Sequence, residues 1–551
     1  MTKSVDLIVT NADVYTCDAA ASHAEAIAVS AGVITAVGTV GDIAELATPE
    51  TDIVDAGGRM VMPGLVDIHM HLLAGGTRMA WELMIEPDDS LDEILASVQA
   101  HAQTTPPNEW IVGGAVGSPV MDQVAAGGHL AALDAAAGGR PVLLRDDSLH
   151  NRWVSSAALE RMGVDRHTPD PSDGSFVRDS AGDLTGVLYE SACAPAEHAA
   201  AEAIGDPADR DRVATRTAID LMNSFGITAM QDAATMESSL RALSALEDAN
   251  GLTAWVVATL PARPGATEGA VGAELYAAAA QYRRAQVRPD FAKFFLDGVP
   301  MTRTAALLEP YICHGPHEDP ADAGPLFWTD DDLVDALEEC HQAGLGAKLH
   351  ATGDRSVRQA LNAIQTMRDR HGAGPIYQIA HVEYVAPADV ARFRALGVVA
   401  DASPYIWFPT PLESSINNQV PPSITQRSWP FRELVDSSAL VAAGSDWPVV
   451  PTPNPWNAME AMITRSNPDP GIPGRTNPDG AIALPEAIAA FTSSSARALG
   501  MTDTVGILSP GRSADFIVLA HNLFDIETSA IHDTEVVQTY FRGRRVHGAD
   551  L

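Results

Sequence analysis

Hydrophobic and polar residues alternate in short runs at both ends of the chain. Near the N-terminal end the alternation predicts strands over residues 5–9, 13–15, 26–30 and 33–37, with a hairpin turn at Ala31-Gly32. The same pattern returns at residues 514–519, 536–541 and 542–546. We therefore expect a small β-sandwich domain formed from residues 1–58 and 505–551.

The centre of the chain has a different pattern. Apolar runs of strand length alternate with Ala- and Leu-rich stretches, such as residues 331–343 and 356–370, that predict helices. The expected strands are residues 60–69, 226–232, 253–260, 291–297, 346–350, 377–383, 398–403 and 440–446. Eight such units fit a closed (β/α)8 barrel, the α/β fold of the TIM type, better than an open sheet. We place this barrel over residues 59–74 and 206–504.

A long segment separates the first two of these strands. About 150 residues lie between them, far more than a loop between a strand and a helix normally contains. The segment includes a ninth candidate strand, residues 141–146. We therefore expect an inserted α/β subdomain over residues 75–205.

The charge balance argues against two classes of partner. The 551 residues include 72 Asp and Glu against 35 Lys and Arg, a net charge of −37. Nucleic acids and anionic membranes attract basic surfaces, so we expect neither as a partner. The four cysteines form no Cys-x-x-Cys pair and no apolar run reaches membrane-spanning length. We accordingly expect a cytoplasmic protein without a disulfide scaffold.

The first predicted barrel strand leads into His69-Met70-His71. Alternate side chains of an extended segment share one face, so both imidazoles point the same way. Two adjacent imidazoles at the end of a buried strand form half of a divalent metal site. The simpler interpretation is that two histidines merely end a strand. The motif alone leaves both interpretations open.

Polar residues on four other predicted strands bear on this choice. They are Lys293, His350, His381 and Asp446, each near the C-terminal end of its strand. That rim is where the active sites of such barrels are built. A single buried lysine or histidine is more often structural, but five strands that agree in position favour an active site.

The motifs around these residues resemble those of the amidohydrolase superfamily, in particular the amidohydrolase-3 branch with its YtcJ-like proteins and N-substituted formamide deformylases. They are Pro-Gly-Leu-Val-Asp-x-His-x-His at 63–71, Lys-Phe-Phe-Leu-Asp-Gly at 293–298, His-Ala-Thr-Gly-Asp at 350–354 and Gly-Ser-Asp-Trp-Pro at 444–448. The tail at residues 506–519 matches as well, so the resemblance covers nearly the whole chain.

The resemblance implies a metal centre that holds one or two Zn2+ ions. The implied ligands are six side chains at strand ends: His69, His71, Lys293, His350, His381 and Asp446. His69, His71 and Asp446 would bind the more buried ion. His350 and His381 would bind the second ion, and Lys293 would bridge both. Lys293 can bridge cations only as a carbamate formed with CO2, because an ammonium has no lone pair to donate. A single-ion site is the alternative if Lys293 is unmodified, and iron or manganese are alternatives to zinc.

The implied reaction is hydrolysis of a carbon–nitrogen bond in an N-substituted formamide, another non-peptide amide or a carbamate. Asp446 would act as the general base, taking the proton of a metal-activated water and returning it to the leaving nitrogen. The second ion or His381 would polarise the carbonyl oxygen. Two alternatives remain: an ester or lactone hydrolase on the same site, and a metal-binding barrel without turnover.

The inserted subdomain covers the barrel mouth in this branch, and we expect it to contribute to substrate binding. The candidate substrate contacts are His150, Trp153, Arg303 and Trp447. Trp153 could instead pack a helix start that His150 caps, and Arg303 could pair with Glu309 or Asp297. We expect a small-molecule substrate and a homodimer.

Overall fold

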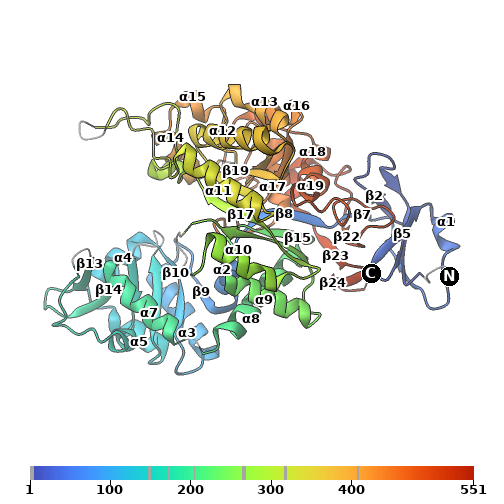
Figure 1. The fold of residues 1–551 in the computed structure, drawn as a ribbon. Coiled ribbons are helices and arrows are strands. Elements are labelled where there is room, and N and C mark those ends of the chain that lie inside the picture. Colours follow the sequence, from blue (N-terminus) through green and yellow to red (C-terminus); the bar gives the residue numbers. More distant parts are fainter. Residues whose placement is uncertain are drawn as a thin grey trace. The chain divides into compact units, whose positions relative to one another are not determined.

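The computed structural model describes residues 5–146, 151–171, 174–203, 205–263, 269–315, 319–405 and 409–550. The chain forms two compact units (Figure 1). The first consists of Met1–Leu72 and Ile219–Leu551, and the second of Leu73–Ala218. Among the described helices, none is both long enough and apolar enough to cross a membrane.

Eight parallel strands form the centre of the first unit. In chain order they are β8 (Leu65–Met70), β15 (Ile227–Asp232), β16 (Trp255–Pro261), β17 (Val287–Phe295), β18 (Gly346–Ala351), β19 (Tyr377–His381), β20 (Val398–Ala402) and β21 (Leu440–Ala443). Each strand pairs with the next. Beyond β21, the amide of Asp446 donates to the carbonyl of His69 at 2.6 Å, so the last strand returns to the first. The predicted TIM-type barrel is confirmed.

Helices pack on the outside of this sheet. The two predicted ones are confirmed as α11 (Asp330–Gln342) and α12 (Asp354–His371), which lie side by side in Figure 1. In α12, Val357, Leu361 and Ile364 are buried at helical spacing, which gives the helix one apolar face. The other longer helices of the unit include α9 (Glu237–Asp248), α10 (Gly272–Ala279), α13 (Pro387–Leu396), α14 (Pro411–Gln419), α17 (Pro455–Thr464) and α18 (Leu484–Ala490).

The first predicted strand, residues 60–69, is two strands in the structure. β7 (Met60–Pro63) pairs with strands of another sheet, and β8 begins the barrel after Gly64. A Cβ on Gly64 would lie 2.2 Å from Oγ1 of the buried Thr228. Glycine is therefore required where the chain passes from one sheet to the other; Pro63-Gly64 is a turn signal at this point, but the predicted strand ran through it.

Substitution of Gly64 tests the close contact at this break. Gly64→Ala should lower the free energy of unfolding by about 1–3 kcal/mol, because Thr228 is enclosed and must move to make room for a methyl group. Denaturant unfolding measures the change. Gly41→Ala is the control, since its Cβ would approach Oγ1 of Thr39 no closer than 3.9 Å. Equal stability of Gly64→Ala and the natural chain would contradict the argument.

Strands from the two ends of the chain form two smaller sheets. Their orders are β5-β4-β1-β6 and β24-β23-β22-β7-β2-β3. The remaining bounds are β1 (Leu7–Thr10), β2 (Asp13–Tyr15), β3 (His23–Ala24), β4 (Ala26–Ser30), β5 (Val33–Gly38), β6 (Asp52–Asp55), β22 (Phe516–Leu519), β23 (Val536–Phe541) and β24 (Arg544–His547). One hydrophobic cluster joins Val29 of the first sheet with Phe516 of the second. The terminal strands thus share a core, while their classification as a β-sandwich stays a prediction.

The second unit contains a six-stranded mixed sheet with the order β13-β14-β12-β11-β10-β9. Its strands are β9 (Glu82–Met84), β10 (Ile111–Val116), β11 (Val142–Asp146), β12 (Asn151–Val154), β13 (Gly174–Arg178) and β14 (Leu184–Glu190). Its helices include α3 (Leu91–Thr104), α4 (Ser118–Ala125), α5 (Leu130–Ala137), α6 (Ser156–Met162) and α7 (Ala194–Glu202). The boundaries 75 and 205, and a place over the barrel mouth, stay predictions.

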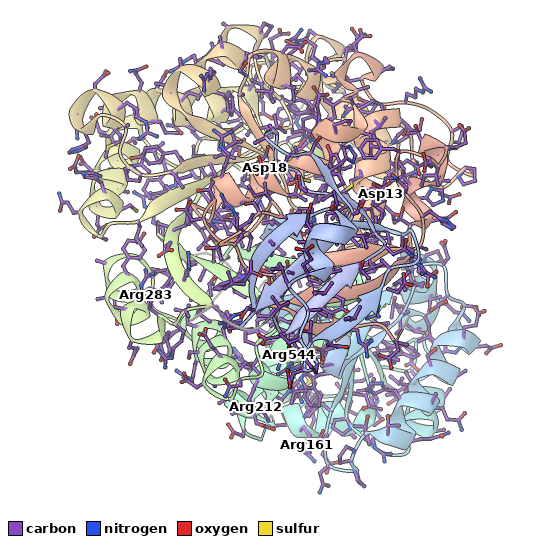
Figure 2. The ribbon with its side chains drawn as sticks, turned by 90° about the vertical axis from the view of Figure 1, so that its right-hand side faces the viewer. Asp13, Asp18, Arg161, Arg212, Arg283 and Arg544 are labelled. Atoms are coloured by element: carbon purple, nitrogen blue, oxygen red, sulfur yellow. The ribbon has the colours of Figure 1, made fainter. Side chains whose placement is uncertain are left out.

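Charged side chains differ in burial between the surface and the barrel interior. Arg161, Arg212 and Arg283, labelled in Figure 2, are exposed. Inside the barrel, by contrast, Lys293 and Lys348 are at most 2% exposed. Charged groups are almost never buried without a partner, so these lysines mark a place where the barrel does more than pack.

Candidate metal centre

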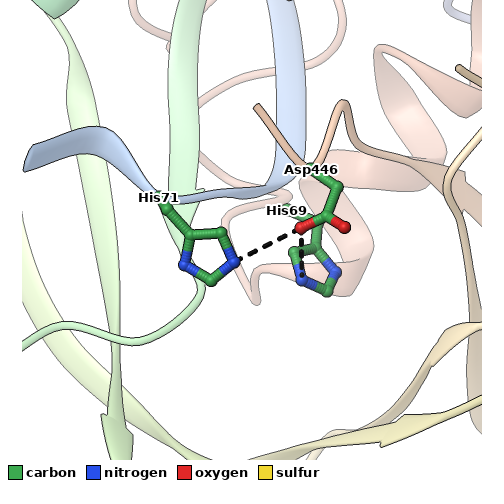
Figure 3. Close-up of side chains that lie close together, drawn as sticks. All are labelled: His69, His71 and Asp446. Carbon is green, nitrogen blue, oxygen red and sulfur yellow. Dashed lines mark ion pairs between the residues drawn. The ribbon is translucent and has the colours of Figure 1, made fainter. Parts of the chain in front are cut away.

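Three side chains converge where the first and last barrel strands end (Figure 3). Nε2 of His71 lies 3.3 Å from Oδ1 of Asp446, and Nε2 of His69 lies 3.5 Å from the same oxygen. One donor atom from each residue lies within 4.8 Å of the other two, and no second group of His, Cys, Asp or Glu does so in the described part of the chain. Two imidazoles and a carboxylate are ligands that suit a divalent transition metal, so the arrangement fits such an ion.

The closeness of these strands depends on Gly444 and Asp67. A Cβ on Gly444 would lie 2.4 Å from the backbone nitrogen of His69, so only glycine allows the chain to pass here. The carboxylate of Asp67 accepts from the amide of His69 at 2.9 Å and from the amide of Ser445 at 3.1 Å. Burial raises the pKa of Asp67 to about 7. Asp67 ties the two chain segments together just behind the predicted metal ligands, a role that the sequence analysis missed.

The local electrostatics keep Asp446 ionised. Burial alone would raise its pKa, but the hydrogen bond from His71 and the nearby His381 and Lys293 lower it to about 2. Its backbone is left-handed, with φ of 60°, as is that of His381, with φ of 76°. Non-glycine residues seldom adopt this conformation, and such strain is concentrated at functional sites.

The other predicted ligands lie close to this group. Nζ of Lys293 is 3.2 Å from Nε2 of His69, and burial together with the charge of Lys348 lowers the pKa of Lys293. The ring of His381 lies 4.8 Å from that of His69 and 4.6 Å from that of His350, centre to centre. Burial lowers the pKa of both His350 and His381, which favours the neutral imidazoles that can bind metal.

Hydrogen bonds distinguish the two nitrogens of each of these rings. Nδ1 of His381 lies 3.0 Å from Oγ of Ser403, so Nε2 is the nitrogen turned away from that contact. Nε2 of His350 lies 3.0 Å from the carbonyl of Gly298, which leaves Nδ1 as the nitrogen available to an ion. Neither ring belongs to the three-residue group of Figure 3.

Two further buried residues contact the site, and the sequence analysis did not select them. Oδ2 of Asp401 lies 2.9 Å from Nδ1 of His69 and accepts a hydrogen bond from Lys348. Burial raises the pKa of Asp401 to about 6, although Lys348 opposes the shift. The sequence did contain a signal for both residues, because Lys348 and Asp401 are charged residues inside otherwise apolar strands.

The predicted substrate contacts fare differently. His150 lies outside the described residues. Trp153 is fully buried in the hydrophobic core of the second unit, which agrees with the alternative that it packs there, while a role in substrate binding stays a prediction. Trp447 is 4% exposed, and its carbonyl accepts from the amide of His71 at 2.8 Å. It therefore supports the chain at His71, and little of its side chain is open to a substrate.

Arg303 has an acidic partner, but not one of those predicted. Its Nε donates to Oδ2 of Asp322 at 3.1 Å, and a second nitrogen donates to the carbonyl of Ile312 at 3.0 Å. Its guanidinium also lies 5.2 Å from the ring centre of Tyr311. These contacts hold together the loop after β17 in place of the alternative pairing with Glu309 or Asp297, while a role of Arg303 in substrate binding stays a prediction.

Comparison with known proteins gives consistent matches over the whole chain. The sequence profile described as the amidohydrolase family matches residues 52–547. The N-substituted formamide deformylase of Arthrobacter pascens is 27% identical to this chain, and the alignment covers 98% of each protein. The YtcJ protein of Bacillus subtilis (strain 168) is 26% identical, and the alignment covers 97% of this chain and 98% of YtcJ. The crystal structure of an uncharacterized metal-dependent hydrolase from Pyrococcus furiosus has a TM-score of 0.73 and 23% identity, covering 94% of this chain and 99% of its own. That structure shows the same fold.

Proposed function

Because the chain belongs to the amidohydrolase family, a family of metal-dependent hydrolases, we propose that it hydrolyses a carbon–nitrogen bond in a non-peptide amide, an N-substituted formamide or a carbamate. The observation that carries the proposal is the convergence of His69, His71 and Asp446 at the C-terminal rim of the barrel. Active sites of such barrels lie at this rim. The formamide deformylase relative supports the choice of bond, since the alignment with it spans nearly the full length of both chains.

Zinc is the proposed metal, because mixed imidazole and carboxylate ligands suit it best. His69, His71 and Asp446 would hold one ion, and His350 and His381 a second. The buried amine of Lys293 lies close enough to His69 to join the same centre. Reaction of the neutral amine with CO2 would form an N–C bond and release a proton, giving a carbamate that could bridge the ions. An unmodified Lys293 would correspond to a single-ion site.

The chemistry divides between the metal and the side chains. When bound, a divalent ion supplies Lewis acidity that makes water more acidic and a carbonyl more electrophilic. Asp446 is ionised and lies beside both histidines, and we expect it to accept the proton of the attacking water and to return it to the leaving nitrogen. His381 lies next to this group and would help to polarise the carbonyl oxygen.

A panel of matched substrates tests the proposal. Zinc-loaded protein should hydrolyse N-substituted formamides, simple amides or carbamates faster than esters and lactones of the same size and substituent. The measurement is kcat/KM for both members of each pair, with the amine followed for the nitrogen substrates and the alcohol or hydroxy acid for the esters and lactones. Hydrolysis of the esters and lactones alone would overturn the proposal in favour of an esterase. Absence of turnover on the entire panel would favour a metal-binding barrel without this activity.

A further inference from the structure

We propose that Asp401 and Lys348 form a buried positioning pair that fixes the orientation and tautomer of His69 for metal binding. The inference rests on the proposed function, because it assigns these residues a task at the same centre. It adds two residues that would act on the metal through His69 without being its ligands.

The contacts join three strands across the barrel interior. His69 is on β8, Lys348 on β18 and Asp401 on β20, and all three side chains are essentially inaccessible to solvent. Nδ1 of His69 is 2.9 Å from Oδ2 of Asp401, and the ammonium of Lys348 donates to that same oxygen. Two donors from different strands thus converge on one carboxylate oxygen.

This geometry determines which nitrogen of His69 carries a proton. An ionised carboxylate only accepts hydrogen bonds, so Nδ1 must carry the proton that it shares with Asp401. The lone pair of the neutral ring is then on Nε2. That nitrogen faces Oδ1 of Asp446 at 3.5 Å and Nζ of Lys293 at 3.2 Å, the side on which the metal ligands converge.

The role of Lys348 follows from the burial of Asp401. The interior of such barrels is usually filled with layers of bulky apolar side chains, and a carboxylate there is unfavourable without a cation beside it. Apolar residues of similar volume often replace a buried ion pair without loss of stability. Stability alone therefore does not explain why Asp401 and Lys348 are paired here. The pair is explained if the carboxylate orients a metal-binding histidine, because loss of such a partner typically weakens metal binding 10–100-fold.

The test compares zinc affinity with the stability of the metal-free protein. Asp401→Asn and Lys348→Met should each lower zinc affinity by about 10–100-fold, measured by competition with a chromogenic chelator. The matched control is Asp389→Asn, which removes a buried carboxylate of α13 that accepts from Arg358 at 2.9 Å. The control should change the melting temperature of the metal-free protein and leave zinc affinity within twofold of the natural chain.

A second measurement is made on the natural chain and does not depend on whether Asp401→Asn and Lys348→Met fold. In the natural chain, 15N NMR of labelled histidine, with His69→Gln for assignment, should show Nδ1 of His69 protonated. Protonation of His69 at Nε2 instead would overturn the proposal. Unchanged zinc affinity in Asp401→Asn would also overturn it, as would a loss of zinc affinity in the Asp389→Asn control as large as that in Asp401→Asn. If the natural chain binds no zinc, the proposed function fails as well. If it binds zinc and Asp401→Asn binds equally well, only the positioning role fails.

Discussion

Removal of metal should abolish hydrolysis, and return of zinc should restore it. Activity toward the best amide or formamide substrate is expected to fall to background after dialysis against a strong chelator. The physical reason is that the side chains of the site, the ionised Asp446 included, offer no nucleophile comparable to water activated by a divalent ion. Metal content, kcat and KM are measured before dialysis, after it and after titration with zinc. Full activity of a preparation without bound metal would contradict the metallohydrolase proposal.

The same titration distinguishes a single-ion site from a carbamate-bridged pair. If Lys293 forms a carbamate, zinc with bicarbonate should restore more activity than zinc in CO2-depleted buffer, and two ions should bind each chain. If the lysine stays an amine, bicarbonate should have no effect and one ion should suffice. Titration with manganese or iron(II) under the same conditions shows whether zinc is the preferred metal.

The fold was predictable because its signals are local and repeated. Each barrel strand is a short apolar run, and β18, β19 and β20 begin at the predicted residues. The helices α11 and α12 follow from apolar residues at helical spacing. The requirement for glycine at position 64 escaped prediction because it depends on the closeness of Thr228, more than 160 residues later in the chain, and nothing in the local pattern records that contact.

In the candidate site, too, the residues with a local sequence signal were predicted and those that depend on distant contacts were not. His69, His71 and Asp446 were found because polar residues at strand ends are recognisable one strand at a time. Asp401 was not, since its role depends on a contact with His69 across 332 residues of sequence. For Trp153 the sequence left substrate binding and packing open because a motif gives no measure of burial, and the structure places its ring in a core.

Replacement of Asp446 should have the largest effect of any single substitution. Asp446→Asn keeps the size of the side chain but cannot take up a proton, so kcat/KM should fall by about 10²–10⁴-fold even at saturating zinc. Because the pKa of Asp446 is lowered to about 2, the carboxylate is present at any pH well above that value. The rate of the natural chain should therefore not decline through Asp446 as the pH is lowered from 7 to about 5.

The leaving group separates a general base from a simple ligand. If Asp446 returns a proton to the departing nitrogen, the loss in Asp446→Asn should be greatest for amides of basic alkylamines and smaller for anilides with electron-withdrawing substituents, whose amines leave without protonation. A residue that only binds metal would give the same loss for both substrates. Zinc content measured alongside excludes a deficit in metal, and full activity of a fully loaded Asp446→Asn protein would remove Asp446 from the reaction.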